Sequence, residues 1–304
     1  MTELSFNGRV AVVTGAGRGI GRAYALLLAS RDASVVVNDL GGSIRGDGSD
    51  EGPASEVVAE IEDRGGIAVA DHHDVSTSAG GQALVDAALR RFGRLDVLIN
   101  NAGIIRWAGM PEVDEDNLDQ HLSVHVGGSF HTTRAAWPTM VEQGYGRIVM
   151  TTSAGVFGLP HNLSYATAKG AVIGMTRSLS TAGAAHGITI NLIAPAAFTR
   201  MAGPADTDGQ PDPMATLMAP ELVAPMVAFL AHEDCPVSGE IYAAGAGRFA
   251  RIVLAQAEGW VDPSSSPSVE DVAAHWDEIN DTTGSWIPTG LMDWSNRFMT
   301  HVDR

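Results

Sequence analysis

Tyr165 and Lys169 are the residues of this sequence best suited to moving a proton, and they stand four residues apart. On a helix this spacing places both side chains on one face. A tyrosine hydroxyl has an ordinary pKa of about 10 and is a poor base at neutral pH. A lysine ammonium one turn away stabilises the phenolate and lowers that pKa. The pair could therefore move a proton on and off a substrate oxygen.

A glycine-rich segment near the N-terminus has the spacing of a nucleotide-binding loop. Gly15, Gly19 and Gly21 follow the apolar run 10–13, which is typical of a buried parallel strand. A helix is expected from about residue 19 to residue 31. Glycines here would let the backbone approach a pyrophosphate, while the helix N-terminus supplies free N–H donors.

Strand and helix patterns alternate along most of the chain. Further strands are expected at 34–38, 68–70, 97–100, 147–150, 188–193 and 240–244. Helical patterns lie between them, among them 115–142 and a helix that carries Tyr165 to about residue 185. This alternation predicts an α/β fold, a Rossmann-type doubly wound parallel sheet of about seven strands with helices on both faces.

The last strand divides the chain into two predicted parts. Residues 1–248 are expected to form the dinucleotide-binding and catalytic domain. Residues 249–304 form a C-terminal extension that contains Trp260, Trp276, Trp286 and Trp294. So many large aromatic side chains argue against disorder, so the extension is expected to pack on its own subunit or on a neighbouring one.

Asp39 ends the second predicted strand, where the adenosine ribose of a dinucleotide should lie. A carboxylate there accepts hydrogen bonds from the ribose hydroxyls and repels a 2′-phosphate. This favours NAD over NADP. Arg18 points weakly the other way, because a basic residue in the glycine loop could meet a 2′-phosphate.

The ordered set of the glycine loop, Asn101-Ala102-Gly103 and Tyr165/Lys169 resembles the short-chain dehydrogenase/reductase family from about Phe6 to about Gly247. The resemblance implies that Tyr165 is the general acid/base and that Lys169 also holds the nicotinamide ribose. The cofactor site that it implies consists of Gly15, Arg18, Gly19, Ile20, Gly21, Asp39, Asp74, Val75, Asn101, Ala102, Gly103, Tyr165, Lys169, Pro195 and Thr199.

Two positions depart from the family pattern. The substrate-binding serine usually precedes the tyrosine by 13 residues, which gives Thr152, whereas Ser153 precedes it by 12. We favour Ser153, because serine lacks the methyl that would crowd a ketone, and Thr152 stays an alternative. His125 stands where the family has an asparagine, and we hypothesise that it replaces that residue in a proton relay. His121 and His125 also have the spacing of a metal pair, but no third ligand pattern accompanies them, so no metal is expected.

The charge and cysteine content of the sequence limit the binding partners and the cellular location that are expected. The net charge of −17 disfavours nucleic acid and anionic membranes. No apolar run of the roughly 18 residues that a membrane helix needs is expected, nor is a signal peptide. The single cysteine, Cys235, fits a reducing cytosol, so a cytoplasmic protein is expected. In the resembled family, helices commonly pack across subunits, which implies a homotetramer or a homodimer.

The substrate is the least determined feature. The segment 196–219 is the expected substrate lid and contains Met201, Met214 and Met218, with Arg200 as its only basic residue. Methionines suit a lipophilic substrate, so we expect NAD-dependent interconversion of a lipophilic secondary alcohol and its ketone. The segments 36–42 and 128–137 and the histidine at 125 are similar to the (3R)-hydroxyacyl-CoA dehydrogenase module of multifunctional β-oxidation enzymes, which is the alternative. A catalytically silent NAD(H)-binding sensor or scaffold is the alternative from another class.

Overall fold

The structure, a computed structural model, describes residues 3–202, 213–263 and 266–302. The chain forms two compact units, Met1–Arg251 and Ile252–Arg304. The predicted boundary after residue 248 lies close to this division, and the assignment of dinucleotide binding and catalysis to residues 1–248 stays a prediction.

The first unit contains one sheet of eight strands in the order β3-β2-β1-β4-β5-β6-β7-β8. The strand pairs from β3 to β7 are parallel. Its strands are β1 Val10–Thr14, β2 Ser34–Asn38, β3 Ile67–Asp71, β4 Val97–Asn100, β5 Gly146–Thr151, β6 Ile188–Pro195, β7 Ile241–Gly245 and β8 Arg248–Ile252.

The α/β prediction is confirmed, with one strand more than expected. Strand β8 follows β7 after only Ala246 and Gly247, which both have positive φ. A two-residue turn can join only antiparallel neighbours. This short hairpin strand is exposed, so it lacks the continuous apolar run by which the buried strands were predicted.

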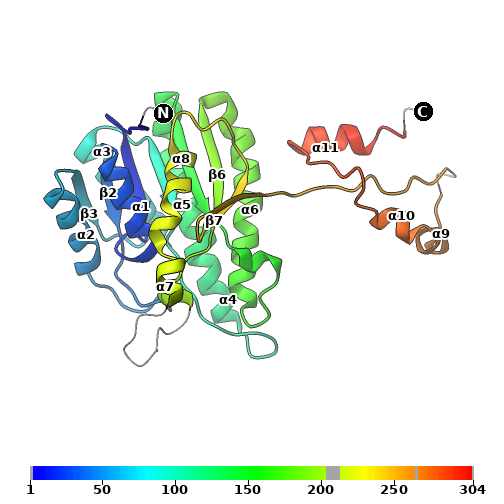
Figure 1. The fold of residues 1–304 in the computed structure, drawn as a ribbon, viewed down its shortest axis with the longest axis horizontal. Coiled ribbons are helices and arrows are strands. Elements are labelled where there is room, and N and C mark those ends of the chain that lie inside the picture. The colour runs from blue at the N-terminus through cyan, green and yellow to red at the C-terminus, as the bar shows by residue number, and fades with distance from the viewer. Residues whose placement is uncertain (1–2, 203–212, 264–265, 303–304) are drawn as a thin grey trace. The chain divides into compact units, whose positions relative to one another are not determined.

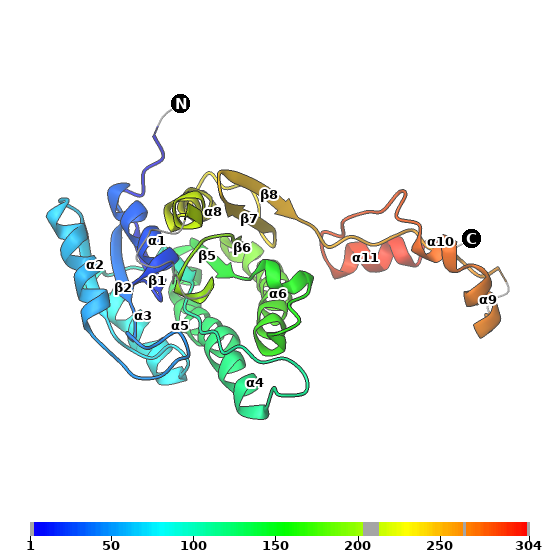
Figure 2. The same ribbon diagram turned by 60° about the horizontal axis from the view of Figure 1, so that its bottom comes forward.

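Helices cover both faces of the sheet (Figures 1 and 2). Helices α1, α2 and α8 lie together on one face, whereas α3, α5 and α6 lie on the other. The helices of this unit are α1 Gly19–Ser30, α2 Gly52–Asp63, α3 Ser78–Phe92, α4 Glu115–His121, η1 Leu122–Gly127, α5 Gly128–Gln143, η2 Ala154–Phe157, α6 Leu163–Gly183, η3 Ala184–His186, η4 Arg200–Ala202, α7 Pro213–Leu217, η5 Pro220–Leu222 and α8 Ala224–Ala231.

The strand order reverses between β1 and β4, because β2 and β3 extend the sheet to one side and β5 to β7 extend it to the other. Side chains on the central strands, such as Val12, Ile99 and Val149, are fully buried between the two helical layers. In sheets of this kind the ligand crevice lies at the carboxyl ends of the strands at the reversal. The fold therefore places a site beside the glycine loop.

The predicted long helix contains a change of helical type. Helix α4 continues into η1, a π-helical segment, and then into α5. One π turn inside an α-helix shifts the side chains that follow and is frequent at functional sites. Here the π segment carries His125.

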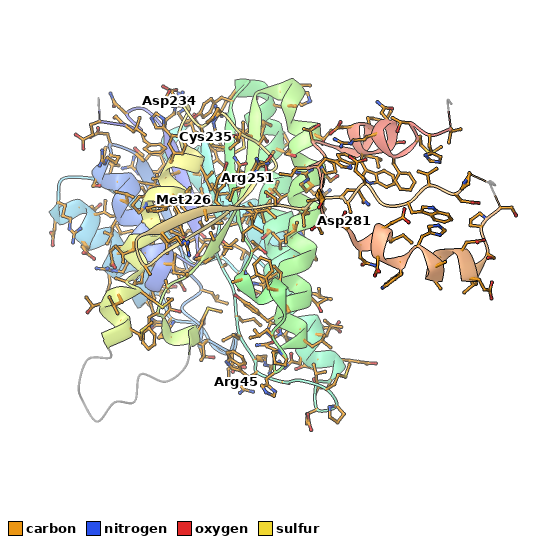
Figure 3. The ribbon with its side chains drawn as sticks, turned by 45° about the vertical axis from the view of Figure 1, so that its right-hand side comes forward. Arg45, Met226, Asp234, Cys235, Arg251 and Asp281 are labelled. Carbon is orange, nitrogen blue, oxygen red and sulfur yellow. The ribbon has the colours of Figure 1, made fainter. Side chains whose placement is uncertain are left out.

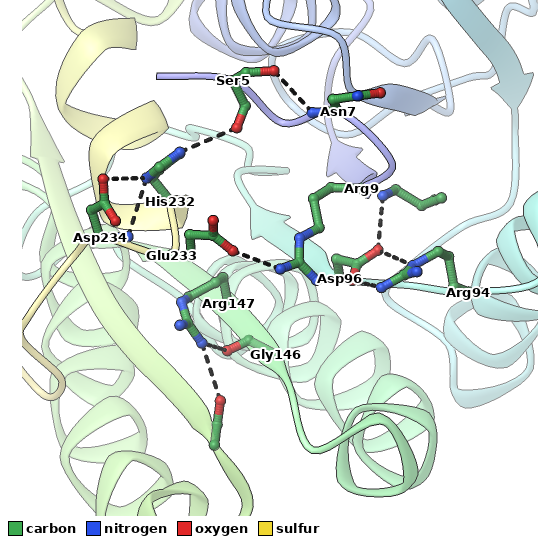
Figure 4. Close-up of polar contacts among 12 residues, drawn as sticks. Ser5, Asn7, Arg9, Arg94, Asp96, Gly146, Arg147, His232, Glu233 and Asp234 are labelled. Atoms are coloured by element: carbon green, nitrogen blue, oxygen red, sulfur yellow. Dashed lines mark hydrogen bonds and ion pairs between the residues drawn. The ribbon is translucent and has the colours of Figure 1, made fainter. Parts of the chain in front are cut away.

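The two ends of the sheet differ in chemistry. Figure 3 shows Arg45, on the loop after β2, at one end of this unit and Asp234 and Cys235 at the other. At the latter end, buried Asp96 accepts hydrogen bonds from Arg9 and Arg94 (Figure 4). These contacts fasten the amino ends of β1 and β4, far from the glycine loop.

One described segment, Met214–Ala231, is long and apolar enough to cross a membrane by composition alone. This corrects the expectation that no such run exists. The segment is divided into α7, η5 and α8. Residues of α8, including Val227 and Leu230, belong to the core beside the sheet, and 28% of the whole segment is buried.

The second unit is organised by its tryptophans. Trp260 stacks on His275 with ring centroids 4.0 Å apart, and Trp286 pairs with Gln256 through two backbone hydrogen bonds. Trp294 donates to the Gln256 side chain. Its helices are α9 Val269–Ala274, α10 Trp276–Asn280 and α11 Leu291–Phe298. Packing of this unit on its own or a neighbouring subunit stays a prediction.

Candidate active site

A cleft of about 500 Å³ lies at the carboxyl ends of β1, β2 and β4. Most of the predicted cofactor residues line it: Gly15, Arg18, Gly19, Ile20, Gly21, Asp39, Asp74, Val75, Asn101, Ala102, Gly103 and Thr199. Three predicted residues, Pro195, Tyr165 and Lys169, are not part of its lining. From the predicted lid, Arg200 and Met201 reach the cleft, whereas residues 203–212 of that lid lie outside the described residues.

At Gly15 and Gly21 the glycine loop leaves no room for a side chain. A Cβ atom on Gly21 would lie 2.2 Å from the carbonyl oxygen of Gly15. The Asn101 side chain donates to the carbonyls of Thr14 and Gly15 at 3.0 and 3.1 Å. In return, the Thr14 hydroxyl accepts from the backbone of Asn101 and Ala102. Asn101 therefore braces the loop, and Thr14 is a supporting residue that the sequence analysis did not single out.

Asp39 is held by two backbone donors. Its carboxylate accepts from the N–H of Gly17 at 2.8 Å and from the N–H of Gly41 at 2.7 Å. These bonds fix the carboxylate at the cleft wall and leave each oxygen a lone pair for a further donor. Arg18, the residue that could favour a 2′-phosphate, lies 3.9 Å from the carboxylate of Asp50.

The acidic, glycine-rich segment 41–53 was predicted to be a loop, and the structure gives it a position. Ser43, Ile44 and Gly46 line the cleft. The Ile44 carbonyl accepts from the backbone N–H of Ile105 at 2.8 Å. The loop thus crosses from β2 to the segment that follows β4 and covers one side of the cleft. A glycine-rich composition predicts a loop but does not predict which part of the molecule the loop packs against.

These features fit a dinucleotide. The glycines let a pyrophosphate approach the backbone, and α1 directs its N-terminus and about half a positive charge at the loop. Asp39 offers acceptors suited to ribose hydroxyls. A nicotinamide ring bound here would supply the hydride acceptor or donor.

Ser153 and Tyr165 form the polar centre beside the cleft. Tyr165 is in the first turns of α6, and Ser153 follows the end of β5. A side-chain hydrogen bond from Ser153 lowers the pKa of the Tyr165 hydroxyl. The Ser153 hydroxyl also accepts from the Gly155 N–H at 3.0 Å, which fixes its direction.

Thr152 has a different environment. Its hydroxyl is buried and donates to the carbonyl of Lys169 at 2.8 Å. Lys169 in turn donates from Nζ to the carbonyl of Thr151 at 2.9 Å. This reciprocal pair fastens α6 to β5. Of the two candidate hydroxyls, the structure brings Ser153 to Tyr165 and engages Thr152 elsewhere.

Tyr165 does not have the lowered pKa that its spacing from Lys169 suggested. The pKa of Tyr165 is raised, because burial outweighs the hydrogen bond from Ser153. The ammonium of Lys169 lies 5.5 Å from the centre of the Tyr165 ring, and burial lowers the pKa of Lys169 to about 7. A half-neutral lysine at this distance is a weaker stabiliser of phenolate than the spacing suggested.

His125 and His121 lie against the ring of Tyr165. Both make edge-to-face contacts with it, at centroid distances of 5.4 and 6.3 Å. His125 Nε2 lies 2.9 Å from the Ile104 carbonyl, whereas His125 Nδ1 is buried with no partner among the described residues. Burial and the charge of Lys169 hold the pKa of His125 well below its usual range. His125 is therefore neutral, with a free ring nitrogen near the catalytic pair.

The chain matches the model of the short-chain dehydrogenase family over residues 9–209. It is 44% identical to a short-chain type dehydrogenase/reductase of Mycobacterium tuberculosis, over 92% of this chain and 96% of that protein. It is 40% identical to the peroxisomal hydratase-dehydrogenase-epimerase of Neurospora crassa, over 96% of this chain and 32% of the relative.

A solved structure, full-length peroxisomal multifunctional enzyme type 2 from Drosophila melanogaster, superposes with a TM-score of 0.80 and 32% identity. The match covers 98% of this chain and 50% of that protein. The chain thus spans a third to a half of these multifunctional proteins and nearly all of the mycobacterial one. It belongs to the short-chain dehydrogenase/reductase family, whose Rossmann fold binds a nicotinamide cofactor.

Proposed function

We propose that this chain is an NAD-dependent dehydrogenase of (3R)-3-hydroxyacyl-CoA thioesters. The observation that carries the proposal is the similarity of nearly the whole chain to one part of hydratase-dehydrogenase-epimerases. Those relatives are named in part as dehydrogenases, and the similarity covers 96% of this chain, with the dehydrogenase motifs inside it.

Asp39 supports NAD as the cofactor. Its carboxylate lines the cleft and is fixed by two backbone donors, so it cannot turn away from a ribose. A 2′-phosphate would meet this negative charge directly. Two arginines line the cleft in the described part of the chain, Arg200 and Arg18, and Arg18 lies 3.9 Å from the carboxylate of Asp50.

The residues divide the proton chemistry among them. Ser153 would hold the substrate oxygen next to Tyr165, whose phenolate would take the hydroxyl proton. An oxidised nicotinamide, when bound, would accept the hydride. The positive charge of such a nicotinamide would favour the phenolate of Tyr165. Lys169, whose pKa burial lowers to about 7, is about half neutral at pH 7 and can accept the proton from Tyr165. His125 Nδ1 is a free acceptor for a water in the relay that the sequence analysis placed there.

An apolar rim favours a lipophilic substrate part. The loop after β4 exposes Trp107 and Met110, and the loop after β5 exposes Phe157. A bridge between Ala108 and Asn162 joins these loops beside the start of α6. An acyl chain fits such a rim, and so does a simple lipophilic secondary alcohol, which is the second candidate. The contact of Ser153 with Tyr165 disfavours the silent sensor.

The test is turnover by the purified chain with NAD and, separately, NADP. The substrates are (3R)- and (3S)-3-hydroxyacyl-CoAs and lipophilic secondary alcohols without CoA, and Tyr165→Phe is the blank. The proposal expects formation of reduced NAD from the (3R)-thioesters only, lost in the blank. Turnover of the alcohols but not of the thioesters would favour the second candidate, a dehydrogenase of lipophilic secondary alcohols. Dinucleotide binding without turnover of any substrate would favour the sensor.

We also carry forward three expectations from the sequence: a homodimer or homotetramer, a cytoplasmic location and no nucleic-acid or membrane partner. The net charge of −17 supports the last of these. Sedimentation of the purified chain tests the first.

A further inference from the structure

Two stacked histidines connect the catalytic tyrosine to the loop at the apolar rim. His121 and His125 are one turn apart and almost fully buried, with 0% and 2% of their surfaces exposed. Their rings are near parallel, with an interplanar angle of 14° and centroids 5.9 Å apart. Tyr165 meets both rings edge-to-face, at angles of 88° and 84°. Three aromatic rings from α4, η1 and α6 therefore form one packed group.

The ring nitrogen atoms of His121 and His125 bind the backbone of the segment that follows β4. His125 Nε2 lies 2.9 Å from the carbonyl oxygen of Ile104, and His121 Nε2 accepts from the N–H of Arg106 at 3.3 Å. The ring centroids of His121 and His125 are 5.9 Å apart, and two residues of extended chain span about 6.6 Å. The spacing of the two histidines is therefore close to the spacing of their backbone partners, since His125 bonds to Ile104 and His121 bonds to Arg106. Arg106 directly precedes Trp107 in this segment.

His121 has no nitrogen left for acid–base chemistry. Its Nδ1 donates to the carbonyl of Asn117 at 2.7 Å, and its Nε2 accepts from Arg106. These bonds define a neutral ring with a fixed tautomer. Burial lowers the pKa of His121, as do the charges of Arg106 and Lys169. The titratable groups that face the pair are thus Lys169 and Tyr165 from α6 and Arg106 from the loop.

We propose that His121 is a positioning residue for Tyr165. It stacks on His125 and supports the edge of the Tyr165 ring, while its bond to Arg106 ties the rim loop to the same group. The tyrosine hydroxyl is thereby kept on Ser153. The inference deepens the proposed dehydrogenase function and rests on it for the catalytic readout only, because the position of Tyr165 can also be measured without substrate.

The experiment compares His121→Leu, which removes the ring and both hydrogen bonds, with His121→Phe, which keeps the flat ring. His186→Leu is the matched control, because His186 is exposed and lies outside the group. The Tyr165 hydroxyl is titrated by ultraviolet difference absorbance, with Tyr165→Phe in each background subtracted. Circular dichroism and NAD binding report whether each variant is folded, and kcat and KM are measured with whichever substrate the chain turns over.

The hydrogen bond from Ser153 lowers the pKa of Tyr165. Loss of that alignment in His121→Leu should therefore move the Tyr165 titration and the pH profile of kcat to higher pH. We expect kcat to fall on the order of 10²-fold with NAD binding within about twofold of the wild type. In His121→Phe the Tyr165 titration should return towards the wild-type midpoint, and KM should rise because Arg106 has lost its acceptor.

An unchanged Tyr165 titration in a folded His121→Leu would overturn the proposal. So would a His121→Phe titration as displaced as that of the leucine variant, because the ring contact would then have no effect. If His121→Leu does not fold, the result rests on His121→Phe. A Tyr165 titration with the wild-type midpoint, together with a raised KM, supports His121 as a positioning residue. A shifted Tyr165 midpoint refutes that role. Absence of turnover in the wild type contradicts the dehydrogenase proposal and leaves the titration result intact.

Discussion

Lys169→Met should make the protein more stable and inactive. Lys169 is the only lysine in the sequence, and burial lowers its pKa from 10.5 to about 7. At about 1.4 kcal/mol per pH unit, keeping it charged in the folded state costs about 5 kcal/mol. Methionine removes this cost but leaves the Thr151 carbonyl without its donor, which costs about 1–3 kcal/mol. Below pH 7 the variant should gain about 2–4 kcal/mol in the free energy of unfolding.

The gain should depend on pH in a defined direction. Above pH 7 the folded wild type releases the Lys169 proton, whereas the unfolded chain holds that proton up to about pH 10. The unfolded state then binds more protons, so wild-type stability rises with pH in this window. The advantage of the methionine variant should therefore shrink between about pH 7 and about pH 10.

The assay is urea unfolding of wild type, Lys169→Met and Lys169→Arg at several pH values in that window. Lys169→Arg is the matched control, because a guanidinium stays charged throughout. It should be less stable than the wild type and lack this pH dependence. Because the chain has one lysine, ¹⁵N-lysine labelling also gives a single side-chain NMR signal, whose titration should centre near pH 7. A methionine variant less stable than the wild type at low pH, or a lysine midpoint near 10, would refute the reasoning.

Four further predictions concern the site. Ser153→Ala should lower kcat by about 10²-fold and move its pH profile to higher pH, because the bond that lowers the pKa of Tyr165 is lost. Thr152→Ala should leave the pH profile of kcat unchanged and reduce the free energy of unfolding by about 1 kcal/mol. If instead the pH profile shifts in Thr152→Ala and not in Ser153→Ala, Thr152 is the substrate-binding residue. Asp39→Asn should raise NADP affinity relative to NAD by at least about tenfold, roughly 1.4 kcal/mol, and an unchanged ratio in equilibrium dialysis would contradict the role given to Asp39. Gly21→Ala should abolish dinucleotide binding in a folded protein, because its Cβ would lie 2.2 Å from the Gly15 carbonyl oxygen; calorimetric binding at wild-type strength would contradict this.

The parts of the fold that a short local pattern specifies could be predicted. Buried parallel strands are continuous apolar runs, so β1 and β4 were found near their true bounds. Glycines 15, 19 and 21 were assigned to the cleft because their function depends on having no side chain. Strand β8 was missed because it is exposed and carries no such run.

The parts that depend on distant contacts could not be predicted. The choice between Thr152 and Ser153 depends on where β5 ends, and one residue there reverses the face that a side chain points to. The pKa of Tyr165 was placed on the wrong side of its ordinary value because burial, which the sequence does not give, outweighs the hydrogen bond from Ser153. The role of His121 requires the loop after β4 to lie beside α4, a contact that no local pattern encodes.

The most direct test of the account is the oxidation of a (3R)-3-hydroxyacyl-CoA by the purified chain with NAD, measured beside its (3S)-enantiomer and the Tyr165→Phe variant. The account predicts reduced NAD from the (3R)-thioester, at least about a hundredfold less from the variant, and none from the (3S)-thioester. Equal rates in wild type and Tyr165→Phe, or no oxidation of the thioester by a chain that binds NAD, would contradict it.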